Sequence, residues 1–285
     1  MIKKDVKVAT TIREQICILK KRGLLISDEV FAEEVLRNIS YYRFIGYTLS
    51  CKVDDIFNPG TTFENIYSLY LFDKKLRSIL ISLLEDIEIS FRSQIAHHHL
   101  IKYGPLGYKD PSNFKCLENH ISFINKLYQS IHQNKKEVFL RHNINKYKDI
   151  AFWVAIETLT FGNLAKLFSN LKDKDQKSIC KNYTTIHYRD VSSWLINLSN
   201  VRNMCAHYGR IYNRKFNLGI GTRGIDAHII NDKIFPRIFI MKKLSSKDSW
   251  ELFYNNLEPL INEYSDKIDL NLIGFPDNWQ SILNV

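Results

Sequence analysis

The sequence predicts an all-α protein, a multi-helix bundle, and three observations lead to that prediction. Only 11 Gly and 6 Pro occur among 285 residues, so the residues that interrupt helices are scarce. Apolar residues recur at spacings of three and four over long stretches, which is the period of an amphipathic helix. Hydrophobic residues make up 45% of the chain and charged residues 25%, a composition that favours a folded core over disorder.

Helices are expected where this periodicity is bounded by capping residues. Thr11 and Glu14 form a capping-box pair ahead of a short helix that Gly23 ends. A second such pair, Thr61 and Glu64, opens the strongest pattern, which continues to about residue 103. Other helices are expected at 28–39 and on through the aromatic cluster 40–47, then at 120–131, 138–147, 152–161, 164–171, 190–212 and 247–264, with a long loop or small hairpin at 213–232 and a strand at 234–241.

We divide the chain into two parts. Residues 1–60 are predicted to form an N-terminal helical segment packed on the core, and residues 61–285 the main helical domain. A formal net charge of +10 favours polyanionic partners, nucleic acid among them.

Cysteine usage and the N-terminus indicate a cytoplasmic protein. The five cysteines never occur as CxxC, which argues against a disulfide framework and against a thiolate zinc site. The first residues lack the apolar stretch of a signal peptide, and the longest apolar run is too short to cross a bilayer. We therefore predict no membrane contact, no metal and no cofactor.

The segment SNVRNMCAHYGRIYNRK contains the candidate site. If it is one continuous helix, Asn203, His207, Arg210 and Arg214 share a polar face, with Arg202 at its edge. The opposite face is then apolar and faces the core. The plainer interpretation is a surface helix end whose charges favour the helix dipole. The apolar positions are Val201, Met204, Cys205, Tyr208 and Tyr212.

These residue types suit metal-independent cleavage of RNA. The ribose 2′-OH attacks its own phosphate when a proton acceptor, a proton donor and fixed positive charge are present. Imidazole serves as either proton carrier near neutral pH, and guanidinium binds phosphate oxygens bidentately. We assign proton transfer to His207, phosphate stabilisation to Arg202 and orientation of the imidazole to Asn203, with Arg210 and Arg214 as further phosphate contacts.

The string RNMCAH resembles the RNxxAH form of the RxxxxH motif of the HEPN superfamily, and nearly the whole chain resembles the Abi family of abortive-infection proteins of the AbiD and AbiF type. Further matching segments are SYYRFIGY, FWVAIETLTFGNLAKLFSNLK and GFPDNWQ. The resemblance implies a HEPN-like bundle with an N-terminal extension, ribonuclease activity in phage defence or as a toxin, and an active site completed by pairing two copies. It also brings an antitoxin or a guide-like non-coding RNA into consideration as a partner.

Three other features have competing interpretations. A second RxxxxH spans Arg92 and His97, where we favour a Glu88–Arg92 ion pair over the alternative that Arg92 or Glu88 lines the cleft across from His207. Tyr42 and Arg43 suit stacking on unpaired bases, although aromatic residues near helix ends more often pack in the core. Histidines 97–99 point in three directions on a helix, so a metal site is disfavoured and a hydrated helix end is expected.

Two other classes of function remain open. A non-catalytic RNA-binding module would use the same basic residues to hold a structured or antitoxin RNA. A protein regulator would need no RNA at all. Binding that survives the loss of His207 separates the first alternative from the nuclease, and absence of RNA binding at low salt indicates the second.

Overall fold

The computed structural model describes residues 8–183 and 186–284, and the all-α prediction is confirmed in them. Short 3-10 turns and one two-stranded antiparallel sheet are the other regular elements of this part of the chain. The elements are α1 (Ile12–Lys21), α2 (Glu29–Ile39), α3 (Tyr41–Ile45), β1 (Lys52–Val53), β2 (Ile56–Phe57), α4 (Phe63–Tyr103), α5 (Leu117–Gln133), α6 (Val138–Lys146), α7 (Phe152–Ala155), α8 (Phe161–Asn170), α9 (Asp173–Ile179), α10 (Tyr188–Ala206), α11 (Phe235–Leu244), α12 (Lys247–Glu263) and α13 (Trp279–Leu283).

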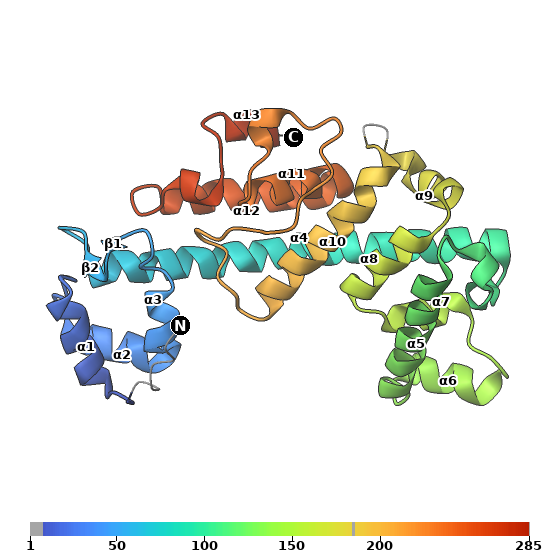
Figure 1. The fold of residues 1–285 in the computed structure, drawn as a ribbon, viewed down its shortest axis with the longest axis horizontal. Helices are drawn as coiled ribbons and strands as arrows, with labels where there is room; N and C mark the ends of the chain where they lie inside the picture. Colours follow the sequence, from blue (N-terminus) through green and yellow to red (C-terminus); the bar gives the residue numbers. More distant parts are fainter. Residues whose placement is uncertain (1–7, 184–185, 285) are drawn as a thin grey trace, which may run out of the picture.

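Helix α4 is the axis of the molecule and runs through its whole length (Figure 1). Its 41 residues span about 60 Å at 1.5 Å per residue. Thr62 caps its N-terminus by accepting from the Asn65 amide, and Gly104 follows its last residue with φ 75°. The predicted long helix is confirmed, although its cap is Thr62 rather than the Thr61–Glu64 pair.

The other helices pack on different sides of α4, and for that reason its buried residues are not confined to one stripe. In Figure 1, α11, α12 and α13 lie above α4, while α1–α3 and α5–α7 lie below its two ends. Helix α12 packs along α4, and α10 contacts both α4 and α8. Several charged residues of α4 are buried with these partners: Asp73, Arg77, Glu88 and Arg92.

The N-terminal helices share their core with α4. The Phe44 ring of α3 stacks on Phe63 at 4.4 Å between centroids, and Leu25 forms a parallel bridge with Thr62. Strands β1 and β2 follow α3 and are joined by two residues with positive φ, Asp54 and Asp55. This hairpin was not among the predicted elements.

The predicted strand at 234–241 is wrong, because these residues form most of α11. The segment is buried on all sides, so its apolar run has no helical period, and periodicity cannot separate a buried helix from a buried strand. Pro236 lies at the start of α11, where a proline is favourable.

The predicted helix at 152–161 is also corrected. Helix α7 ends at Ala155 and a 3-10 turn follows, and α8 begins at Phe161 behind the cap residue Thr160. Gly162 and Asn163 therefore lie in the first turn of α8. The long loop expected at 213–232 is confirmed apart from one 3-10 turn. Across the described parts of the chain, none of the helices is both long and apolar enough to pass through a bilayer.

Candidate functional site

Helix α10 ends earlier than the sequence predicts. Its last helical residue is Ala206, and His207 is the C-cap. The amide of Gly209 donates to the Met204 carbonyl at 2.8 Å and the amide of Tyr208 to the Cys205 carbonyl at 3.1 Å, which is the Schellman pattern of a helix end. The single polar helix face from Asn203 to Arg214 is therefore wrong, since Arg210 and Arg214 lie on the loop after the helix.

The residues of this turn explain why the helix stops here. Tyr208 adopts the left-handed conformation, with φ 58°, and its side chain is exposed instead of packed in the predicted core. A Cβ on Gly209 would lie 2.8 Å from Cγ of Met204, so only glycine fits without a shift. Arg43 of α3 donates from Nη1 to the Tyr208 carbonyl at 2.6 Å and so holds the turn from outside.

The three residues assigned to catalysis remain open to solvent around this helix end. Asn203 and His207 are exposed, and the Arg202 side chain keeps 36% of its accessible surface. The Asn203 side-chain oxygen accepts from Nη1 of Arg202 at 3.3 Å, and its carbonyl accepts from the His207 amide at 2.9 Å. Asn203 thus contacts both the arginine and the backbone of the histidine.

Cys205, inside the same motif, takes no part in the exposed chemistry. Its side chain is buried, and burial raises the pKa of the thiol to about 12. It is therefore a neutral thiol near pH 7, and we assign it to the core side of α10, as predicted.

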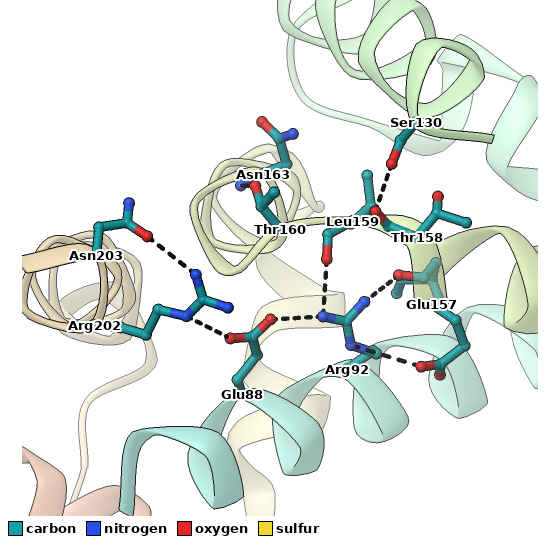
Figure 2. Close-up of polar contacts among 11 residues, drawn as sticks. Glu88, Arg92, Ser130, Glu157, Thr158, Leu159, Thr160, Asn163, Arg202 and Asn203 are labelled. Atoms are coloured by element: carbon teal, nitrogen blue, oxygen red, sulfur yellow. Dashed lines mark hydrogen bonds and ion pairs between the residues drawn. The ribbon is translucent and has the colours of Figure 1, made fainter. Parts of the chain in front are cut away.

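Glu88 of α4 connects the motif to the interior (Figure 2). Its Oε2 lies 3.7 Å from Nε of Arg202, and its Oε1 accepts from Nη2 of Arg92 at 2.7 Å. Arg92 also donates to the carbonyls of Ile156 and Leu159, in the turn before α8. The predicted Glu88–Arg92 pair is present, and Glu88 is the carboxylate that faces Arg202.

Arg92 was carried as a candidate RNA contact, and its surroundings do not suit that role. Its side chain keeps only 9% of its accessible surface and donates to Glu88 and to two backbone carbonyls. A guanidinium that is buried with these partners has no free donors facing solvent for a phosphate. Arg92 lies on the buried side of Glu88, and Arg202 contacts the same carboxylate from the solvent side.

A second buried carboxylate, Asp73 of α4, holds the loop that follows the motif. One of its oxygens accepts from the amides of Ile211 and Tyr212 at 3.0 and 2.7 Å. The other accepts from the Tyr47 hydroxyl at 2.6 Å and from Arg77. Burial raises the pKa of Asp73, whereas Arg77 and these donors act in the opposite direction.

The remaining basic and aromatic candidates gather beside this loop. Arg210 is half-buried and donates to the carbonyls of Tyr212 and Asn213, and burial lowers the pKa of its guanidinium. Arg210, Tyr42 and Arg43 line a pocket of about 310 Å³ between α3 and the loop. Tyr42 is 85% exposed and Arg214 is also exposed, so the surface there is basic and aromatic.

The expected hydrated end at histidines 97–99 is wrong for His99. Its ring is buried, packs 4.8 Å from the Phe152 ring between centroids, and burial lowers its pKa to about 4. His98 contacts the buried carboxylate of Asp175 at 2.8 Å, which ties α4 to α9. Within the described residues, no three His, Cys, Asp or Glu side chains are grouped so as to hold a metal ion.

Sequence reasoning offered Arg92 or Glu88 as lining the cleft across from His207, but it missed the contact of Glu88 with Arg202. This contact joins residues more than a hundred positions apart, and no local spacing signals it. The role of Asp73 was also missed, although an acidic residue in an otherwise apolar face of a long helix was a usable signal, because a buried charge needs partners.

Comparison with known proteins gives one result for this chain. The sequence model of a family described as Abi-like protein matches residues 34–213, which include α4, α8, α10 and the whole RNMCAH segment. Searches of curated proteins and of solved structures gave no match.

Proposed function

The chain belongs to the Abi-like protein family, which fits a role in abortive-infection defence, and from that premise we propose that it is a metal-independent endoribonuclease of the HEPN type. The proposal assigns the chemistry to Arg202, Asn203 and His207. The same activity would serve phage defence or a toxin, since cleavage of host or phage RNA ends the infection. The proposed location is the cytoplasm, where such RNA is found.

The proposed reaction is a transesterification within the RNA. The 2′-oxygen loses its proton, forms a bond to the neighbouring phosphorus and displaces the 5′-oxygen, which receives a proton. The products are a 2′,3′-cyclic phosphate and a 5′-hydroxyl end. DNA does not react because it lacks the 2′-OH. His207 carries a proton in this scheme, and Arg202 stabilises the negative charge on the non-bridging oxygens.

The ion pair with Glu88 supports the assignment to Arg202. A carboxylate at 3.7 Å limits the directions in which a long side chain points, and a preorganised guanidinium loses less freedom when it binds phosphate. Because this contact is longer than a direct hydrogen bond, the guanidinium keeps donors for a ligand.

The reaction needs a base that takes the proton of the 2′-OH and an acid that protonates the 5′-oxygen. One imidazole can act as only one of these at a time. We propose that two copies of the chain form a homodimer in which the two RNMCAH segments face one cleft, so that one His207 acts as base and the other as acid. Arg210, Arg43 and Tyr42 line one pocket, and Arg214 is exposed on the same loop as Arg210; we propose that these four residues bind RNA around the motif. An antitoxin or a guide-like RNA would mask the same surface.

The observation that carries this proposal is the access of solvent to all three motif residues at the end of α10, where Asn203 and His207 are exposed and Arg202 is partly exposed. A histidine buried in the core would have no access to a ribose. In this chain His207 caps a helix at the surface, with Arg202 and Asn203 one turn before it.

The test is cleavage of RNA by the purified full-length protein in the presence of a chelator. We expect cleavage with cyclic phosphate ends, a loss of at least about a hundredfold in His207→Ala, and no cleavage of DNA. The matched control is His142→Ala, because His142 is an exposed histidine on α6 outside the motif. Wild-type rates in His207→Ala would refute the nuclease, and tight RNA binding without products would favour the non-catalytic module.

A further inference from the structure

A cleft with both apolar and polar lining lies between α5, α8 and α10, next to the motif but outside it. Its volume is about 280 Å³. Lysine, asparagine and serine side chains provide most of its polar lining, and neither Asp nor Glu lines it. The residues used in the argument are Asn119, Ser122, Lys126, Asn163, Lys166 and Ile196.

The cleft is continuous with the motif along α10. Ile196 and Asn203 are seven residues apart and therefore lie on the same face of the helix, about 10 Å apart along its axis. The start of α8 packs against α10 just before the motif, since a Cβ on Gly162 would lie 3.8 Å from the Ser199 hydroxyl. Figure 2 shows the Asn163 and Asn203 side chains both directed away from Glu88.

Except for Ser169, whose hydroxyl donates to the Ala165 carbonyl, the polar side chains of the cleft are free to bind a ligand. Across the described residues, the side chains of Lys126 and Lys166 form no ion pair, and those of Asn119, Ser122 and Asn163 form no hydrogen bond. Lys115, which also lies near these helices, is by contrast paired with Asp173 at 2.6 Å. Two unpaired cations among neutral donors, without a carboxylate, suit a phosphodiester backbone.

We propose that this cleft is a binding site for the RNA strand on one side of the cleavage point. Lys126 and Lys166 bind phosphate oxygens, and Asn119 and Asn163 donate to phosphate or sugar oxygens. The separation of about 10 Å along α10 is longer than the roughly 3.4 Å rise of one stacked nucleotide, so the cleft would bind the strand beyond the linkage that is cut. This inference rests on the proposed function for the position of the strand, but binding in the cleft is measured without cleavage.

The experiment measures binding of a 2′-O-methyl 12-nucleotide RNA, which lacks the attacking hydroxyl and is not cut. The variant is Lys126→Ala with Lys166→Ala, and the control is Lys135→Ala with Lys136→Ala, two exposed lysines just after α5 that remove the same charge. Each lost phosphate contact lowers the salt dependence of log K by about 0.7 for a single strand, so the cleft variant should lose about 1.4. We expect its Kd to rise at least tenfold at low salt, while the control changes by less than threefold.

A cleavage assay with two substrate lengths separates this inference from the nuclease. A dinucleotide is too short to reach the cleft, so the cleft variant should cut it at the wild-type rate and cut the 12-nucleotide RNA more slowly. Equal binding by the cleft variant, the control and the wild type, or an absence of binding by the wild type, would overturn the site. Cleft-dependent binding without any cleavage would keep the site and refute the nuclease.

Discussion

Replacing Glu88 by alanine tests the link between the core and the motif. The carboxylate is 11% exposed and contacts two arginines, Arg92 at 2.7 Å and Arg202 at 3.7 Å. Without it, the buried Arg92 guanidinium loses its close counter-ion and keeps only backbone carbonyls and the distant Glu157. Removing one partner of a buried ion pair costs about 3–5 kcal/mol. We expect the lower end, about 3 kcal/mol, because the carbonyls still accept from Arg92.

The assay is thermal unfolding followed by circular dichroism. At roughly 2–4 °C per kcal/mol for a chain of this size, Glu88→Ala should lower Tm by about 6–12 °C. The matched control is Glu157→Ala, because Glu157 pairs with the same Arg92 but is 52% exposed and 3.9 Å away. An exposed pair of this kind contributes less than about 1 kcal/mol. Equal and small losses in the two variants would refute the buried ion pair as a determinant of stability.

Three further predictions concern the helix end, a buried histidine and the anchored loop. Tyr208→Gly should raise the free energy of unfolding in urea by about 0.5–1 kcal/mol, because glycine adopts the left-handed backbone conformation of residue 208 without the strain that a tyrosine has there. A lower free energy of unfolding would contradict this. Burial holds the pKa of His99 at about 4, below its unfolded value near 6.5, so the stability from its neutral ring is complete above pH 6.5 and is lost as pH falls toward 4. Between pH 7 and pH 5, the free energy of unfolding of the wild type should fall by about 2 kcal/mol more than that of His99→Phe. Equal falls in the two proteins would contradict a lowered pKa of His99. Asp73→Asn should speed hydrogen exchange at the amides of Ile211 and Tyr212 at least tenfold, and unchanged protection would show that other contacts hold the loop.

Much of the fold could be predicted because it depends on local patterns. Helix α4 follows from an apolar period that continues for forty residues without a glycine or a proline. The capping box of Thr11 and Glu14 is present as expected. Helix α11 could not be recognised because burial on all sides removes the period.

For the candidate site too, the sequence predicted one part and not the other. The residues of the motif were found in the sequence, but their arrangement on one helix face was not correct. The predicted polar face assumed that the helix continues past Ala206. The turn at Tyr208 and Gly209 ends α10 there. Gly209 was visible in the sequence as a stop signal, yet the amphipathic pattern through Tyr212 favoured a longer helix.

Local sequence patterns were enough to predict the helical class, the long helix α4 and the arginine, asparagine and histidine of the candidate site. Those features depend on residue type and on spacings of a few positions. Only the tertiary structure decided that Glu88 holds Arg202, that Arg92 lies inside, and that α3 and Asp73 fix the loop carrying Arg210. These contacts join segments more than 60 residues apart, and their formation depends on how whole helices pack rather than on any local period.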